Sequence, residues 1–417
     1  MKNKYTFVLF CLLLFPSINS IGIPIVSPYI MTTEPTLSLP VNGVSHYNIT
    51  GSVKYQVVIN FSLTSTSGTN NYYFKFARIN NRTPTSPLTN NTPPYQESSL
   101  IYNSISGKTP YEIAMNQNDK FNNTYDWYNV TLNTGQTTYF DQKYNVTLNA
   151  IRFQDIDNSS IGPYNPSDII FDLYGNHTEP YYETDEPSLY YLTKSIVLPT
   201  DNPVEKAEKI CNWVANNIVY NGFLPPQEKG ALWAYTNLQG DCSEYSSLMV
   251  TLLRIQGIPA RKVTGFLISN NPSLRPAVGN VWNFNSNEGS SNILGHAWVE
   301  YYVPNIGWIA CDPTWHSGVN YFNRIDFLRF NLNVGANFFF PPSFTVSEFS
   351  NPIIGYTGPY QYDYDITITV LGTELPPLTE FPIYIAIFII VGFVAVIGVI
   401  FLLLTKGRKK VVNNYDY

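Results

Sequence analysis

The feature that most restricts this chain is a charge-free segment near its C-terminal end, from Phe381 to Leu404. A helix rises about 1.5 Å per residue, so these 24 residues can cross the roughly 30 Å hydrocarbon layer of a membrane. A buried core helix is the alternative, but it would carry a polar face, and this segment has none. We therefore predict one transmembrane helix over residues 381–404.

The flanks of this segment predict its orientation. Lys406, Arg408, Lys409 and Lys410 follow it directly, and such cationic clusters stay cytoplasmic. We expect residues 405–417 to be a cytoplasmic tail and the chain before the helix to lie outside, at the cell membrane.

The first 20 residues have the pattern of a secretory signal peptide. Lys2 and Lys4 precede an apolar run over residues 7–15, which is too short to span a bilayer, and Pro16 ends that run. We predict that residues 1–20 are removed, with an uncleaved anchor as the alternative.

The charge of the predicted extracellular part excludes one class of partner. Without the predicted signal peptide and tail, the chain has 18 basic and 29 acidic residues. Nucleic-acid binding is usually built on cationic surfaces, so no nucleic acid is expected as a partner.

N-glycosylation sequons gather in the first half of the chain. Nine begin at Asn48, Asn60, Asn81, Asn90, Asn122, Asn129, Asn145, Asn158 and Asn176. None follows Asn176, which marks a change of composition, and we place a domain boundary near residue 180.

The first half also has the patterns of strands. Alternating β-branched and aromatic residues predict strands over residues 52–63, 72–79, 127–132 and 144–153. We expect residues 21–180 to form an all-β, sandwich-like or barrel domain that is glycosylated outside the cell.

The second half changes character at Asp201. Helices and strands are expected over residues 203–218, 242–256, 261–268, 296–302 and 308–312. Residues 269–292 are predicted to be a polar loop. This order is typical of an α+β domain, which we place at residues 181–345. Residues 346–380 are expected to form a hairpin, around residues 364–371, and a Pro-rich linker.

Cys242 lies at the predicted start of a helix, after Gly240 and Asp241. The amides of a first helical turn and the helix dipole favour a thiolate, the nucleophilic form of cysteine. A buried, inert cysteine is the alternative, but Cys242 precedes the apolar stripe of its helix. We therefore expect a functional thiol.

A nucleophilic thiol needs a base, and the base needs an orienting group. His296 opens one predicted strand and Asp312 ends the next, so the imidazole Nδ1–H and the carboxylate can meet. Their side chains share a face only if the connection is odd in length, such as one from Val303 to Gly307. We predict that odd register.

Together these segments resemble the transglutaminase-like superfamily. The family's pattern is G-x-C at a helix start, then G-I-P-A-R, then H-A-W-V-E and D-P-T. This chain has GDCSEYSSLMVTLLRIQGIPARKVTGF at 240–266 and HAWVEYYVPNIGWIACDPTW at 296–315. The resemblance covers about residues 185–320.

The resemblance implies a papain-like core and thioester chemistry. Cys242 would attack a carboxamide or peptide carbonyl, His296 would carry the proton, and Asp312 would hold the imidazole. The backbone N–H of Cys242 would be one oxyanion donor. Tyr220 and Trp233 are candidates for the second donor.

No cofactor is expected. No His, Cys or Asp cluster has the spacing of metal ligands, and nothing resembles an EF-hand loop. Arg261 is expected in an internal salt bridge, and Glu300 is expected to face solvent or to form local hydrogen bonds.

Three cysteines remain after removal of the signal peptide, and an odd count outside the cell suggests one free thiol and one disulfide. If Cys242 is the nucleophile, Cys211 and Cys311 are left as a possible pair. Two buried free thiols are the alternative.

Three functions fit the sequence. The favoured one is a surface-anchored hydrolase of peptide or amide bonds, whose partner is a protein or peptide at the cell surface. The second is a transglutaminase that cross-links proteins. The third is a non-catalytic binding or envelope protein, against which the intact triad argues.

Overall fold

The structure is a computed structural model. It describes residues 46–82, 92–154, 156–225, 227–287, 289–335, 338–340, 344–346 and 351–376. The predicted signal peptide, transmembrane helix and tail, and the sequon at Asn90, lie outside the described residues. Within the part that is described, no helix is long and apolar enough to cross a membrane.

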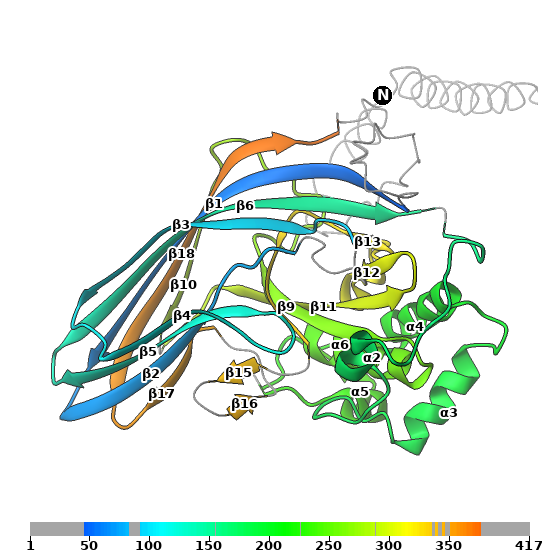
Figure 1. Cartoon of the computed structure of the whole chain (residues 1–417), viewed down its shortest axis with the longest axis horizontal. Coiled ribbons are helices and arrows are strands. Elements are labelled where there is room, and N and C mark those ends of the chain that lie inside the picture. The colour runs from blue at the N-terminus through cyan, green and yellow to red at the C-terminus, as the bar shows by residue number, and fades with distance from the viewer. Residues whose placement is uncertain are drawn as a thin grey trace, which may run out of the picture. The chain divides into compact units, whose positions relative to one another are not determined.

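A β-rich part is built from two antiparallel sheets (Figure 1). The strands of the first sheet are β1 (Tyr47–Ser65), β3 (Gln96–Gly107), β6 (Thr137–Phe153), β10 (Val281–Asn287), β13 (Arg324–Ile325) and β18 (Tyr360–Glu374). Their order is β10-β18-β1-β6-β13, and β3 also pairs with β6. The strands of the second sheet are β2 (Thr69–Ala77), β4 (Glu112–Asn118), β5 (Thr124–Asn133) and β17 (Ile353–Tyr356), in the order β17-β2-β5-β4.

The inner faces of these two sheets pack against each other. Buried and less buried residues alternate along β1, as expected of a strand with one face in a core. The ring centroid of Phe74 on β2 lies 4.7 Å from that of Phe140 on β6, in an edge-to-face contact. Rings from both sheets thus fill the interior, as the predicted sandwich requires.

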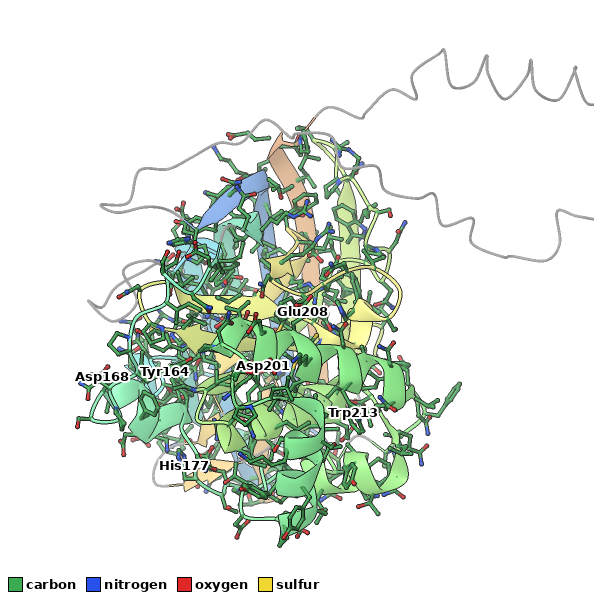
Figure 2. The ribbon with its side chains drawn as sticks, turned by 90° about the vertical axis from the view of Figure 1, so that its right-hand side faces the viewer. Tyr164, Asp168, His177, Asp201, Glu208 and Trp213 are labelled. Carbon is green, nitrogen blue, oxygen red and sulfur yellow. The ribbon has the colours of Figure 1, made fainter. Side chains whose placement is uncertain are left out.

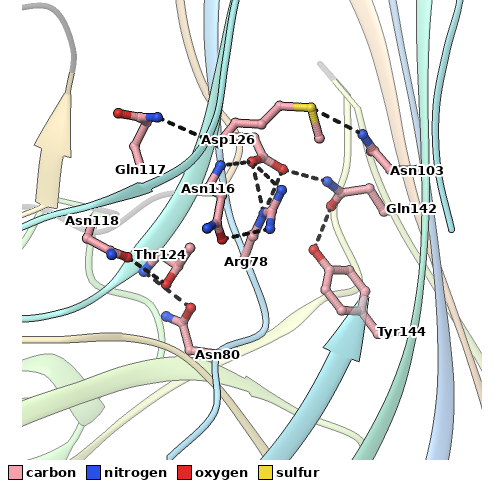
Figure 3. Close-up of polar contacts among 11 residues, drawn as sticks. Arg78, Asn80, Asn103, Asn116, Gln117, Asn118, Thr124, Asp126, Gln142 and Tyr144 are labelled. Atoms are coloured by element: carbon pink, nitrogen blue, oxygen red, sulfur yellow. Dashed lines mark hydrogen bonds and ion pairs between the residues drawn. The ribbon is translucent and has the colours of Figure 1, made fainter. Parts of the chain in front are cut away.

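A polar network is also buried between these sheets (Figure 3). The carboxylate of Asp126 accepts hydrogen bonds from Arg78 Nε at 2.9 and 3.0 Å and from the backbone N–H of Asn116 at 2.8 Å. Gln142 donates to it at 2.9 Å and accepts from the Tyr144 hydroxyl at 2.9 Å. A buried carboxylate is tolerated here because paired donors replace its water.

The sheets do not follow the predicted boundary at residue 180. β18 pairs with β1 over most of its length, and β10 pairs with β18, so late segments complete the first sheet. β10 lies within residues 269–292, which we predicted to be a loop. The predicted hairpin over 346–380 is also wrong, because β17 and β18 pair with β2 and β1 in different sheets.

The second part contains the helices and a four-stranded sheet. The helices are α2 (Ile169–Tyr174), α3 (Pro187–Ile196), α4 (Pro203–Asn217), α5 (Ala231–Asn237), α6 (Cys242–Ile255) and α7 (Pro313–His316). The strands are β9 (Ala260–Leu267), β11 (Leu294–Val303), β12 (Gly307–Cys311) and β14 (Arg329–Val334), in the order β12-β11-β9-β14. Short pairs are formed by β7 (Val219–Tyr220) with β8 (Gln239–Gly240), and by β15 (Phe338–Phe340) with β16 (Phe344–Val346). The main helices and strands predicted for this half are confirmed.

Local signals account for the helix α4. The side chain of Asn202 accepts hydrogen bonds from the N–H groups of Val204 and Glu205, both at 2.9 Å, and Glu205 accepts one from the Asn202 N–H at 2.8 Å. This capping box satisfies amides that have no partner within the helix. Asp201, which Figure 2 labels just before the helix, pairs with Lys209 at 2.6 Å.

The four-stranded sheet lies between α6 and the β-rich part. On one face, Cys311 contacts Met249 of α6, with 3.9 Å between the sulfur atoms. On the other face, Glu300 is buried between two arginines and pairs with Arg82 at 2.7 Å and with Arg261 at 2.8 Å. The predicted salt bridge of Arg261 is confirmed. The prediction that Glu300 faces solvent or forms local hydrogen bonds is wrong, because it is buried and its partners are distant in the sequence.

The described sequons are not equally accessible. Six lie on exposed residues, namely Asn60, Asn81, Asn122, Asn145, Asn158 and Asn176, and Asn48 is partly exposed. Asn129 is only 5 % exposed, and its amide donates to Glu112 at 2.7 Å. A buried, bonded amide cannot receive a glycan, which argues against Asn129 as a candidate.

Replacement of Glu300 tests the contact between the two parts. Burial alone would raise the pKa of Glu300, but the guanidinium groups of Arg82 and Arg261 lower it below its usual value. In Glu300→Ala two buried cations would lose their partner, so we expect the free energy of unfolding in urea at pH 7 to fall by about 3–5 kcal/mol. Glu97→Ala, at an exposed position of β3, is the control and should change it by less than about 0.5 kcal/mol. Equal effects of the two substitutions would contradict this reading.

Candidate active site

Cys242 is the first residue of α6, as the sequence predicted. Asp241 caps the helix and accepts a hydrogen bond from the Ser243 N–H at 2.8 Å, while Glu244 accepts from the Asp241 N–H at 3.0 Å. A Cβ on Gly240 would lie 2.4 Å from the Cβ of Glu244, so only glycine fits before this turn. The tight turn places the thiol at the tip of the helix.

The hairpin of β11 and β12 brings His296 and Asp312 together. Val303 pairs with Gly307, so the connection has the predicted odd length. The two side chains therefore share a face, and His296 Nε2 lies 2.7 Å from an oxygen of Asp312. One detail differs, because the carboxylate binds Nε2 and not the predicted Nδ1. The imidazole ring also contacts the rings of Trp298 and Trp315, whose centroids lie 6.3 and 5.8 Å from its own.

The thiol of Cys242 lies at the start of β11, where its sulfur accepts a hydrogen bond from the backbone N–H of Ala297. Ala297 follows His296 directly, so nucleophile and imidazole belong to one site. The N–H of Cys242 itself is in the first turn of α6, where helix geometry provides no intrahelical acceptor. It can therefore donate to a developing oxyanion.

The ionisation of this thiol differs from the expectation. Burial, followed by the negative charge of Asp241, raises the pKa of Cys242 to about 12, although the Ala297 N–H and Lys262 act in the opposite direction. The helix tip alone would favour a thiolate, but desolvation and the capping carboxylate outweigh it. These effects together favour the neutral thiol of Cys242 at neutral pH.

The carboxylate of Asp312 is fully buried and has four donors. Besides His296, it accepts from the N–H groups of Thr314 at 2.9 Å and Trp315 at 3.2 Å, and from the guanidinium of Arg329. Burial alone would raise the pKa of Asp312, but His296 and Arg329 hold it well below its usual range. Asp312 is therefore ionised whenever the protein is folded at ordinary pH.

Arg329 is the functional residue that the sequence did not indicate. It is buried at the start of β14, outside the three motifs, and it also pairs with Asp326 at 3.0 Å. Its guanidinium lies 4.5 Å from the ring centroid of Trp315 and 4.8 Å from that of Tyr321. None of the three motifs marks it, because its contact with Asp312, 17 residues earlier, forms only in the folded chain, where β14 pairs with β9.

The two candidates for a second oxyanion donor lie in different places. Tyr220 is on β7, and the charges of Cys242, Asp241 and Asp312 act on its phenol. Its pKa is raised, chiefly by burial, so it keeps a proton to donate. Trp233 lies on α5, and no contact among the described residues joins it to the triad. Tyr220 is therefore the better of the two candidates.

The disulfide predicted between Cys211 and Cys311 is not present, because all three described cysteines are free. The two thiols are nevertheless neighbours, since the side chain of Cys311 hydrogen-bonds to that of Cys211. Both are buried in the core between α4 and β12, beside Met249. The structure therefore holds the alternative, two buried free thiols, and not the possible disulfide.

Comparison with known proteins agrees with this geometry. Residues 190–313 match the model of the transglutaminase-like superfamily, and this range contains Cys242, His296 and Asp312. The chain contains a transglutaminase-like domain. The residues before 190 and those from Thr314 onward, Arg329 among them, lie outside the matched range.

Two relatives match short stretches of the chain. A stretch of 79 residues is 40% identical to a protein-glutamine gamma-glutamyltransferase of Pseudomonas aeruginosa, over 18% of this chain and 10% of that protein. A stretch of 120 residues is 28% identical to the uncharacterized protein YebA of Bacillus subtilis, over 27% of this chain and 16% of that protein. The chain therefore spans less than a fifth of the length of these two relatives.

Solved structures resemble more of the chain at low identity. A candidate cysteine protease from Cytophaga hutchinsonii is 16% identical, with a TM-score of 0.48, over 79% of this chain and 94% of that one. The periplasmic domain of TgpA from Pseudomonas aeruginosa, bound to ethylmercury, is 17% identical, with a TM-score of 0.28, over 61% of this chain and 92% of that one.

Substitution of Asp241 tests the cause of the raised thiol pKa. Asparagine caps a helix about as well as aspartate but carries no charge. Asp241→Asn should therefore lower the pKa of Cys242 and increase its alkylation by iodoacetamide at pH 7.5 by about tenfold. Peptide mass spectrometry of the alkylated protein gives the rate at Cys242 itself. Asp363→Asn, on the exposed side of β18, is the control, and an equal rate in both variants would contradict the assignment.

Replacement of Arg329 tests its role as a positioning residue. Arg329→Lys keeps the charge but not the forked contact to two carboxylates, and should lower kcat/KM about tenfold, whereas Arg329→Met should lower it about 100-fold. Because Arg329 contacts Asp312 and not the thiol, the loss should appear in kcat/KM measured per folded molecule. A purely structural role would lower the melting temperature and leave kcat/KM of the folded fraction unchanged.

Proposed function

We propose that this protein is a membrane-anchored cysteine enzyme of the cell surface that opens peptide or carboxamide bonds through a thioester on Cys242. The observation that carries the proposal is the hydrogen-bonded chain from the Asp312 carboxylate to His296 Nε2 at 2.7 Å, beside the thiol at the tip of α6. This arrangement supplies the nucleophile, base and orienting group of acyl transfer.

The neutral thiol defines the first step. As Cys242 Sγ bonds to the substrate carbonyl carbon, its proton passes to His296, and the carbonyl oxygen becomes an oxyanion. The backbone N–H of Cys242 and the phenol of Tyr220 are the donors that face this oxygen. Because proton transfer accompanies attack, the imidazole acts as a general base, and no thiolate has to exist beforehand.

The second step releases the amine. The imidazolium returns its proton to the nitrogen, the C–N bond breaks, and ammonia or a peptide amine leaves. The acyl group then remains on sulfur as a thioester. Water that loses a proton to His296 can attack this thioester, which gives an acid and the free thiol. Hydrolysis needs no second binding site, and we favour it.

Transfer to an amine is the second candidate. One stretch of this chain is 40% identical to part of a protein-glutamine gamma-glutamyltransferase, and this favours an acceptor amine in place of water. The same residues would act in the same order, with a lysine nitrogen attacking the thioester. A binding protein that keeps the fold is the remaining alternative.

One experiment separates these functions. The full-length protein is incubated with a glutamine-containing peptide library, with and without dansylcadaverine. Dansyl incorporation indicates transfer, whereas ammonia release or new peptide ends without incorporation indicate hydrolysis. Both should fall at least 1000-fold in Cys242→Ala and His296→Gln, because each removes a reacting group.

The control for these variants is His177→Gln, which replaces a partly exposed histidine outside the triad. It should retain the activity of the natural sequence. The folded protein could instead form neither product, and its Cys242 could resist iodoacetamide at pH 9. That result would refute the proposed enzyme activity and favour a binding function.

A further inference from the structure

Four large apolar side chains near Cys242 are exposed to solvent. Val219 is 68% exposed, Tyr220 57%, Phe223 98% and Leu238 46%. Single exposed apolar residues are common on soluble proteins, but a group of them around a functional site is a mark of binding. We call these four residues the apolar ridge.

The ridge borders Cys242 because of how β7 and β8 pair. Tyr220 is the register partner of Gly240, which lies two residues before Cys242. The N–H of Asn221 donates to the Gly240 carbonyl at 2.9 Å, which holds the loop of Phe223 against the same turn. The ring of Tyr220 lies 6.3 Å from that of Tyr245, one helical turn beyond Cys242.

The strand β7 also presents an open edge. The N–H groups of Val219 and Asn221 bond to the carbonyls of Leu238 and Gly240, both at 2.9 Å. In a parallel pair the intervening residue points its N–H and C=O the other way, so the main chain of Tyr220 faces outward. Among the described residues, the sheet of β7 and β8 has no third strand. Such an edge accepts another extended chain.

We propose that the apolar ridge and the outer edge of β7 bind the acyl-donor segment of the substrate as an extended peptide with an apolar or aromatic side chain next to the reacting carboxamide. This rests on the proposed function and names its substrate class. A lipid surface would cover the same side chains but would leave the main-chain donor and acceptor of Tyr220 without partners, so the strand edge favours a peptide.

Kinetics with two peptides test the proposal. One peptide carries Val-Phe before a glutamine, and its counterpart carries Ser-Ser there. In the full-length protein, Phe223→Ser should raise KM for the Val-Phe peptide about tenfold and leave kcat within about twofold, because the side chain contributes binding and not chemistry. For the Ser-Ser peptide, Phe223→Ser should change KM little. Tyr356→Ser, at a 61% exposed position on β17, is the matched control and should change neither constant.

A binding measurement separates this inference from the enzyme assignment. Fluorescence anisotropy of the dye-labelled Val-Phe peptide is recorded with Cys242→Ala, and with Cys242→Ala combined with Phe223→Ser or Tyr356→Ser. We expect about tenfold weaker binding for the Phe223→Ser protein only. An active enzyme with equal KM and equal peptide affinity in both serine variants would overturn the ridge while leaving the enzyme intact. Unchanged peptide affinity with weaker binding to phosphatidylcholine vesicles would assign the ridge to a membrane and overturn the peptide.

Discussion

The site depends first on a buried carboxylate that is kept ionised. Asp312 is fully buried, where an unpaired charge would be neutralised by a proton. Two N–H groups of α7, the imidazole of His296 and the guanidinium of Arg329 replace its water. Since Asp312 is also the cap of α7, the interaction that orients the base begins the helix after it. Catalytic geometry and local folding are therefore satisfied by the same hydrogen bonds.

The surroundings of Cys242 favour the neutral form of its thiol. Burial raises the pKa of Cys242 most strongly, and the negative charge of Asp241 at the tip of α6 raises it further. The Ala297 N–H and the charge of Lys262 act in the opposite direction but do not outweigh these two effects. The residue that caps α6 therefore also opposes a thiolate at the first position of that helix.

Sequence reasoning succeeded where contacts are local. His296 and Asp312 are 16 positions apart and are joined by one hairpin, so the parity of its connection was sufficient to place them on one face. The helix start at Cys242 followed from the turn at Gly240 and Asp241 and from the apolar stripe after it, and the structure confirms it. The bonded nitrogen of His296 was predicted wrongly, because the strand register determines the face on which the ring lies but not how the ring is turned.

Sequence reasoning failed where contacts are distant. The strand β18 pairs with β1, some three hundred residues earlier in the chain, and no pattern in either segment predicts this partner. We predicted a loop at β10 because its serine and asparagine residues are typical of loops. The segment forms a strand only because β18 lies beside it and pairs with it. The pKa of the Cys242 thiol could not be predicted from the sequence either. A helix tip in water would lower this pKa, whereas burial of the same tip against β11 raises it.

The distant contacts matter to the chemistry because the β-rich part holds the segment that carries Arg329. Ile325 pairs with Ile151 of β6, and the carbonyl of Phe327 accepts a hydrogen bond from Tyr55 of β1 at 2.9 Å. Two residues later Arg329 opens β14 and reaches Asp312. The residues that match the superfamily end at 313, so they hold the triad but not the cation that balances it. The β-rich part is thus a support of the active site, and the ionisation of Asp312 depends on strands more than 150 residues earlier in the chain.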